Sequence, residues 1–220
     1  MKVFEYSNIG RRDINQDYII SMLLSQEVSV HLVADGMGGY DCGEVASKVV
    51  GDSFVDSFNR GLSIVEATQE ASKNLRLTRQ NLGITRMGST VAGVLIKNNN
   101  AEVFWAGDSR VYIYRDNKLL YQTTDHSVVN ELSQVRQLTF EEKERLNHIV
   151  TRSIMGVPTD EVDTAAFSLQ SGDEILICTD GIYKDCPIDY LIESIRENRF
   201  DIDKQNEGFT DNHSLIYIEL

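Results

Sequence analysis

Residues that define several protein classes are scarce in this sequence. Among 220 residues there are only two prolines, one tryptophan and three cysteines. The cysteines, Cys42, Cys178 and Cys186, are odd in number and follow no Cys-x-x-Cys spacing. This pattern predicts reduced thiols in a cytoplasmic protein rather than a disulfide framework. None of them has an arginine six positions later, so the phosphate-binding loop of cysteine-based phosphatases is absent.

Positive charge and long apolar runs are also lacking. Lysines and arginines number 21 against 34 aspartates and glutamates, which gives a formal net charge of −13. Such a chain would be repelled by nucleic acid and by anionic membrane surfaces, so we expect neither as a partner. No apolar run reaches the roughly 18 residues of a membrane span, and no signal-peptide pattern is present.

No linker, repeat or low-complexity segment divides the chain. Because Pro158 and Pro187 are the only prolines, we predict one domain over residues 1–220. A chain of this length buries a substantial apolar core without disulfides.

Short apolar runs rich in β-branched and aromatic residues predict strands, and apolar steps of three and four residues predict helices. The predicted strands are 3–6, 18–24, 28–34, 90–96, 101–106, 111–115, 118–122, 163–169, 174–179 and 213–219. The predicted helices are 43–60, 63–80, 127–148 and 188–197. Short turns join most strands and no Gly-x-Gly-x-x-Gly occurs, so the pattern favours an α+β fold of antiparallel sheets with helical outer layers.

Five aspartates stand at the ends of predicted strands. They are Asp17, Asp35, Asp108, Asp180 and Asp211, and three of them have a glycine neighbour (Gly36, Gly107 and Gly181). Taken singly, each is typical of turn chemistry, because Asp-Gly favours tight turns. The repeated pattern favours a second interpretation, in which the carboxylates gather at one rim of the sheets and glycine lets backbone or ligand come close.

Gathered carboxylates repel one another, and one or more would stay protonated unless a cation lies among them. Ligation by oxygen alone selects Mg²⁺, Mn²⁺ or Ca²⁺ rather than zinc. The residues by themselves therefore predict a divalent-cation site on a protein of two sheets.

Eight motifs occur in the order found in the metal-dependent protein phosphatases of the PP2C (PPM) type. They are RRDINQD (11–17), VADGMGG (33–39), GST (88–90), AGDSRVYIYRDNKL (106–119), TTDHSVV (123–129), TRSIMG (151–156), SGDEILICTDGIY (171–183) and DNHSLIYI (211–218). The chain resembles the compact bacterial members over essentially its whole length. The resemblance implies a four-layer αββα sandwich, in which helices flank two antiparallel sheets. It also implies hydrolysis of protein phosphoserine and phosphothreonine by a water activated at a binuclear Mn²⁺ or Mg²⁺ centre, often with a third ion.

The resemblance assigns roles to individual residues. It implies that Asp35 bridges the two principal ions, and that Asp180 and Asp211 complete the protein ligands of one of them. The carbonyl of Gly36 would bind the other ion, and Asp17 would hold the water shell of that ion.

The remaining assignments concern the third ion and the substrate. Asp108, together with Asp180, would serve the weaker third ion. Arg12 matches the arginine that binds substrate phosphate, with neighbouring Arg11 as its competitor. Met37 stands where eukaryotic members often carry a histidine regarded as a general acid, and a methionine has no proton to donate.

Two further segments match the family less specifically. His126 is predicted to be structural rather than catalytic. Residues 127–152 match the variable flap beside the family's active site, but their polarity is equally typical of an ordinary exposed helix.

The resemblance also implies partners. We expect phosphorylated protein substrates of a bacterial-type Ser/Thr kinase, and a monomeric, cytoplasmic enzyme. Two alternatives stay open: a pseudophosphatase that uses the same fold as a binding module, and a metal-dependent phosphatase of a small-molecule phosphate. Retention of all five aspartates argues against the first.

Overall fold

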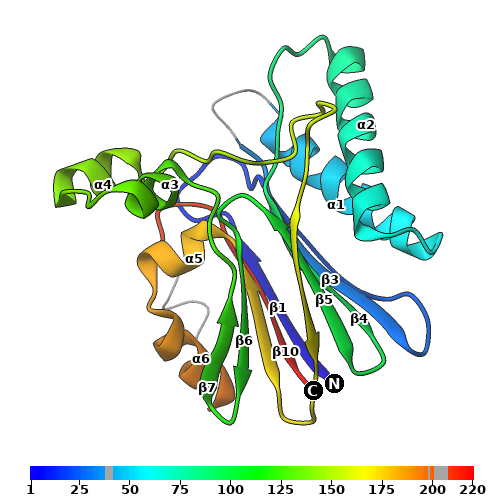
Figure 1. The fold of residues 1–220 in the computed structure, drawn as a ribbon, viewed down its shortest axis with the longest axis vertical. Helices are drawn as coiled ribbons and strands as arrows, with labels where there is room; N and C mark the ends of the chain where they lie inside the picture. Colours follow the sequence, from blue (N-terminus) through cyan, green and yellow to red (C-terminus); the bar gives the residue numbers. More distant parts are fainter. Residues whose placement is uncertain (38–41, 198, 201–207) are drawn as a thin grey trace.

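The chain is described by a computed structural model covering residues 1–37, 42–197, 199–200 and 208–220. Gly38 and Gly39, which end the predicted VADGMGG motif, lie outside these residues. The described residues form ten strands in two five-stranded sheets and six helices (Figure 1).

The first sheet has the strand order β1-β10-β9-β6-β7, and all of its pairs are antiparallel. Its strands are β1 (Lys2–Asn8), β10 (His213–Glu219), β9 (Glu174–Cys178), β6 (Arg110–Arg115) and β7 (Lys118–Gln122). β10 therefore lies between the first strand of the chain and β9. The central strands β9 and β10 are almost entirely buried, because helices cover one face and the second sheet covers the other.

The second sheet has the order β2-β3-β4-β5-β8 and is also antiparallel throughout. Its strands are β2 (Asp17–Leu23), β3 (Val28–Asp35), β4 (Val91–Lys97), β5 (Asn100–Ala106) and β8 (Asp163–Ser168). Side chains of both sheets, such as Val94, Ile113 and Ile216, form the apolar layer between them.

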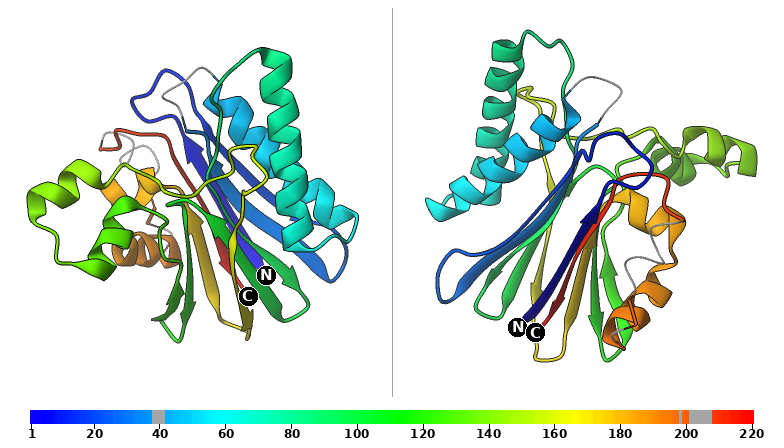
Figure 2. Two further views of the ribbon diagram at one scale, coloured as in Figure 1. Left: turned by 45° about the horizontal axis from the view of Figure 1, so that its top comes forward. Right: turned by 180° about the vertical axis from the view of Figure 1, so that it is seen from behind.

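Helices cover the outer face of each sheet (Figure 2). α1 (Gly43–Asn59) and α2 (Ile64–Leu82) pack on the second sheet, where the rings of Phe54 and Phe104 stack with centroids 5.0 Å apart. α5 (Asp180–Asp185) and α6 (Ile188–Arg196) pack on the first sheet. The predicted α+β architecture of four layers, αββα, is confirmed.

The structure corrects two of the predicted elements. The predicted helix 127–148 is two helices, α3 (Val128–Val135) and α4 (Phe140–Leu146), because Thr139 caps a new helix by accepting a hydrogen bond from the Glu142 N–H. The predicted strand 174–179 ends at Cys178, and the unpredicted helix α5 follows it after a single residue.

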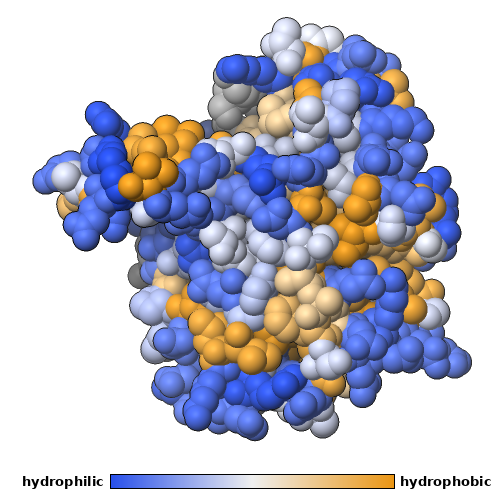
Figure 3. Space-filling model, viewed as in Figure 1, coloured by the Kyte–Doolittle hydropathy of each residue, from blue (hydrophilic) through white to orange (hydrophobic). Residues whose placement is uncertain are grey.

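α3 and α4 project from the sandwich (Figures 1 and 2). Neither helix buries a residue, and apolar side chains are exposed on this projection (Figure 3). Val135 is 83% exposed and Phe140 is 74% exposed. The predicted flap region is therefore an extension beside the core rather than part of it. None of the described helices is long and apolar enough to cross a membrane.

Candidate metal centre

Strand ends bring the five predicted aspartates to the same end of the sandwich. Asp17 begins β2 and lies opposite Asp35, the last residue of β3, in the register of the second sheet. Asp108 follows β5, Asp180 begins α5 directly after β9 and Thr179, and Asp211 lies two residues before β10. The sheet termini thus place carboxylates from distant parts of the chain around one rim.

The charges on these groups act on one another. Burial raises the pKa of Asp35 well above its ordinary value, and the negative charges of Asp17, Asp180, Asp108 and Asp211 raise it further. A carboxyl group that responds to four others lies in a concentrated negative field. The sequence-based prediction that these aspartates gather is therefore matched by their positions.

Two more of the aspartates are strongly perturbed. Burial raises the pKa of Asp17 to about 7, with Asp180 and Asp211 adding to the effect and hydrogen bonds from Ser214 and Thr179 opposing it. Burial also raises the pKa of Asp108 to about 7, aided by Asp180 and opposed by Lys184. Asp108 is only 6% exposed. At neutral pH each group would be only about half ionised, and a nearby cation would favour the charged form.

One carboxylate oxygen in this cluster is orphaned. Asp17 Oδ2 accepts a hydrogen bond from the Thr179 hydroxyl at 2.8 Å. Asp17 Oδ1 is buried and has no hydrogen-bond partner among the described residues. Buried polar atoms are normally paired, so this oxygen points to a ligand that the protein chain does not supply.

Two basic side chains reach the aspartates. Lys184 Nζ donates to Asp180 Oδ2 from four residues along α5. Arg12 Nη2 donates to Asp211 Oδ2 at 2.8 Å, and its side chain is 57% exposed. Arg12 thus lies beside Asp211 and is open to solvent. Lys184 is a site residue that the sequence interpretation missed, because the helix that carries it was not predicted.

Backbone contacts fix the end of β3. The Asp35 N–H donates to Thr90 Oγ1 at 3.1 Å, and the Asp35 carbonyl accepts from the Ser89 hydroxyl at 3.0 Å. A Cβ on Gly36 would overlap the backbone carbonyl of Gly43 at the start of α1. Glycine at position 36 therefore allows the end of β3 and the start of α1 to approach closely.

Asn212 ties the loop of Arg12 to the last strand. Its side-chain amide donates to the carbonyls of Ile9 and Ile14 at 2.9 and 3.0 Å, and its Oδ1 accepts from the Gln16 N–H at 2.9 Å. Asn212 is 5% exposed. Asn212 therefore positions the loop between β1 and β2, a role the sequence interpretation did not assign to it.

His126 holds the turn that contains Asp108. Its Nδ1 accepts from the Gly107 N–H at 3.1 Å, so its Nε2 carries the proton that faces Asp163, 3.2 Å away. The imidazole ring is stacked on Trp105. These contacts match the prediction that His126 is structural.

Met37 lies against Gly88. Its N–H donates to the Gly88 carbonyl at 3.1 Å, and its terminal methyl would meet a Cβ placed on Gly88. The position next to Gly36 therefore brings an apolar side chain and no titratable group to the site.

The donor set suits a hard divalent cation. Asp17, which has the orphaned oxygen, lies opposite Asp35 and in the field of Asp180 and Asp211, and carboxylate ligands favour Mg²⁺ or Mn²⁺. As they lie, no three carboxylate, imidazole or thiolate side chains in the described ranges meet closely enough to hold an ion. The chemistry of the residues thus fits a metal, while their side chains are held partly by Lys184 and Arg12.

Comparison with known proteins gives a consistent result. Residues 5–212 match the family model described as protein phosphatase 2C. The protein phosphatase PhpP of Streptococcus pneumoniae is 30% identical over 194 residues, which cover 83% of this chain and 79% of that protein.

Solved structures share the fold. The serine/threonine phosphatase of S. agalactiae is 28% identical, with a TM-score of 0.77 and coverage of 100% of this chain and 99% of that one. The catalytic domain of the serine/threonine protein phosphatase PstP, solved in complex with two manganese ions, has a TM-score of 0.82 at 23% identity. That alignment covers 99% of this chain and 97% of the PstP domain.

Proposed function

Because the chain belongs to the protein phosphatase 2C family, we propose that it is a protein-serine/threonine phosphatase that hydrolyses phosphoserine and phosphothreonine at a centre of two Mn²⁺ or Mg²⁺ ions. The supporting observation is the rim of five aspartates, in which a buried Asp17 oxygen lacks a partner. A rim so negative would repel a phosphate dianion unless cations reversed its sign.

The proposed ligands follow the predicted roles. In this proposal Asp35 would serve both ions, Asp180 and Asp211 would serve one of them, and the Gly36 carbonyl and Asp17 would serve the other. Divalent ions bound there would lower the pKa of water towards neutrality and neutralise charge on the phosphoryl oxygens.

Arg12 is the proposed phosphate-binding residue. A guanidinium has five N–H donors in a planar fork, so Arg12 can hold a phosphate while one nitrogen keeps its contact with Asp211. The Arg12 side chain is more than half exposed, so an incoming substrate could reach it. Asn212 and Asp211 position it, because both tie its loop to the start of β10.

Protonation of the leaving serine or threonine oxygen needs a donor other than residue 37. Met37 packs against Gly88 and carries no exchangeable side-chain proton. The proton that the leaving oxygen takes up must therefore come from water at the site or from a neighbouring acid.

The proposed substrates are proteins that a Ser/Thr kinase has phosphorylated. The relatives named as serine/threonine phosphatases support this substrate class. A cytoplasmic location and a monomeric state belong to the same proposal. Size-exclusion chromatography with light scattering checks the monomeric state.

The test is hydrolysis of a phosphothreonine peptide with Mn²⁺, with and without excess EDTA, by the native chain and by Asp35→Asn. We expect turnover only by the native chain with Mn²⁺. Turnover that survives both EDTA and Asp35→Asn would refute the metal mechanism. Turnover of a small aryl phosphate but of no phosphopeptide would favour a small-molecule phosphatase, and Mn²⁺ binding without any turnover would favour a pseudophosphatase.

A further inference from the structure

Lys184 is a basic side chain that contacts the rim of aspartates directly. Its ammonium donates to Asp180 Oδ2, and its side chain is only 38% exposed. Its positive charge also reaches Asp108, which is buried on the neighbouring turn. Asp108 and Asp180 are the two residues for which a third ion is expected from the family resemblance.

Contacts on both sides of Lys184 fix the short helix α5. The Tyr183 hydroxyl donates to the Asp108 carbonyl at 2.9 Å, and the Arg110 guanidinium lies 3.5 Å from the centre of the Tyr183 ring. On the other side, Asp185 accepts from the Thr210 N–H at 3.0 Å. Residue 184 is therefore held between the Asp108 turn and the segment that leads to Asp211.

The backbone of α5 is equally constrained. A Cβ on Gly181 would overlap the carbonyl of Asn212, so α5 lies directly against the segment that carries Asp211. A helix of six residues has little stability of its own, and these tertiary contacts hold it in place. Packing of α5, rather than a flexible surface loop, thus holds the Lys184 ammonium at the rim.

Taking the metal centre proposed above as given, we propose that the Lys184 ammonium replaces a third divalent cation beside Asp108 and Asp180, so that this phosphatase loads two ions rather than three. Lys184 is then a positioning residue, which keeps Asp180 in place and offsets the charge of Asp108. Two divalent ions, together with Lys184 and Arg12, are enough to offset the five carboxylates.

A purely structural role is the competing explanation. An Asp and a Lys four residues apart on a helix stabilise it in either case. A structural role predicts that removing the ammonium lowers the melting temperature and leaves the number of bound ions unchanged. The number of bound ions therefore separates the two roles.

The experiment counts Mn²⁺ ions bound to the full chain by electron paramagnetic resonance of free Mn²⁺ and by isothermal titration calorimetry, without substrate. We expect two ions on the native chain and on Lys184→Arg. We expect Lys184→Met to take up a third ion. Its affinity for that ion should be at least about tenfold higher than the affinity of the native chain for a third Mn²⁺. Adding Asp108→Asn to Lys184→Met should remove that third ion again.

The matched control is Lys48→Met. Lys48 also pairs with an aspartate four residues away, Asp52 at 2.9 Å, but on α1 and with both side chains about half exposed. We expect it to leave the ion count at two. Melting curves in EDTA show whether each variant is folded.

The outcomes separate this inference from the proposed function. Two ions on both the native chain and folded Lys184→Met would overturn the role of Lys184 and leave the metal centre intact. Three ions on the native chain would also overturn it. No bound ion on the native chain would refute the proposed metal centre, and the role of Lys184 with it.

Discussion

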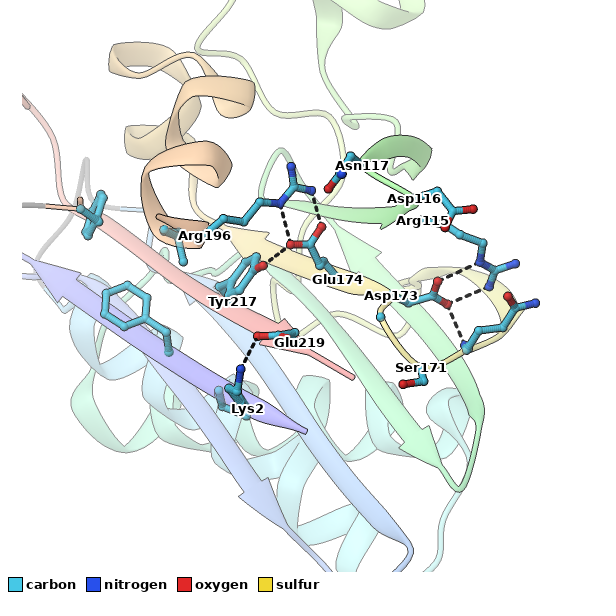
Figure 4. A pocket seen from close by; sticks show the side chains of 16 residues that line it. Lys2, Arg115, Asp116, Asn117, Ser171, Asp173, Glu174, Arg196, Tyr217 and Glu219 are labelled. Carbon is cyan, nitrogen blue, oxygen red and sulfur yellow. Dashed lines mark hydrogen bonds and ion pairs between the residues drawn. The ribbon is translucent and has the colours of Figure 1, made fainter. Parts of the chain in front are cut away.

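The two ends of the sandwich hold their carboxylates differently. At the end where β9 leads to α5, Asp108 is buried, Asp17 and Asp35 are half-buried, and all three have raised pKa values. At the other end, a pocket of about 810 Å³ contains Asp173 and Glu174, and each has an arginine partner (Figure 4).

Both carboxylates at the pocket end, Asp173 and Glu174, accept hydrogen bonds from charged partners. Asp173 accepts two hydrogen bonds from Arg115, at 2.8 and 2.7 Å, and these lower its pKa. Burial raises the pKa of Glu174, but hydrogen bonds from Arg196 and the Tyr217 hydroxyl outweigh it, so its net pKa is lowered. One sandwich thus shows both outcomes of burying carboxylates. Charges with partners stabilise the fold, and charges left short of partners form a site that needs a ligand.

The largest expected effect is a loss of activity when a carboxylate at the aspartate rim is removed. Asp35→Asn should lower kcat on a phosphopeptide by about 10³-fold or more, because it removes the central proposed ligand. In EDTA its melting temperature should stay the same or rise, because a repelled buried charge is lost. Steady-state kinetics with Mn²⁺ and thermal unfolding in EDTA check the two halves of this prediction. A fully active variant would contradict it.

The second prediction concerns the pocket end, where we expect a loss of stability and no loss of activity. Asp173→Asn should leave kcat unchanged and lower the free energy of unfolding by about 2 kcal/mol, because Arg115 loses its charged partner. That corresponds to a fall of about 6 °C in Tm for a chain of this size. Urea unfolding checks the stability, and the phosphopeptide assay is the control. A loss of activity without a loss of stability would show that the pocket end is coupled to the site.

The pH dependence of stability should have opposite signs at the two ends. In EDTA, Asp17 and Asp108 have folded pKa values of about 7 against ordinary values of 3.8. The folded state therefore binds their protons first, and their contribution to stability grows as pH falls from about 8 towards 4. Asp173 and Glu174 have lowered folded pKa values, so they stabilise the fold above their ordinary values of 3.8 and 4.5 and lose this contribution only as pH falls below those values.

The measurement is the change in Tm between pH 8 and pH 6 in EDTA, compared between the native chain and Asp17→Asn or Asp108→Asn. The native chain should gain more, or lose less, on acidification than either variant. Burial lowers the pKa of His31 and of His213, and both oppose the gain, but they are common to all three proteins and cancel in the comparison. Identical pH dependence in all three would show that Asp17 and Asp108 titrate normally.

The smallest effect is expected at an exposed pair beside the pocket. Lys2 and Glu219 lie 3.0 Å apart, with side chains 82% and 46% exposed. Lys2→Ala should change the free energy of unfolding by no more than about 0.5 kcal/mol, because water screens exposed pairs. Urea unfolding beside Asp173→Asn gives the contrast. A loss as large as that of Asp173→Asn would mean that burial does not separate the strong pairs from the weak ones.

Local sequence patterns predicted a large part of this molecule. An apolar run followed by Asp and Gly is a local feature, so Asp35, Asp108 and Asp180 could be placed at strand ends without the structure. The strands could be predicted equally well, because β3 and β4 are buried almost throughout and therefore appear as apolar runs in the sequence. Their assembly into the four-layer sandwich was implied by the resemblance and is confirmed.

Features that depend on distant parts of the chain were not predicted. Asn212 bonds to Ile9 and Ile14, which are 203 and 198 residues away, and no local pattern indicates such a partner. α5 was missed because it has only six residues and is held by tertiary contacts, so Lys184 was missed with it. The register that sets Asp17 opposite Asp35 likewise depends on how β2 and β3 pair.

The position of β10 between β1 and β9 has a consequence for synthesis on the ribosome. Asp211 and the strand that anchors it emerge about 200 residues after Arg12 and Asp17. Strands more than 200 residues apart pair late in folding, because closing such a long loop costs conformational entropy. A nascent chain that stops before residue 211 lacks both Asp211 and the Asn212 clamp on the Arg12 loop. Catalytic competence should therefore appear only once residues 211–219 have left the ribosome and β10 has paired, which makes activity a direct measure of completed folding.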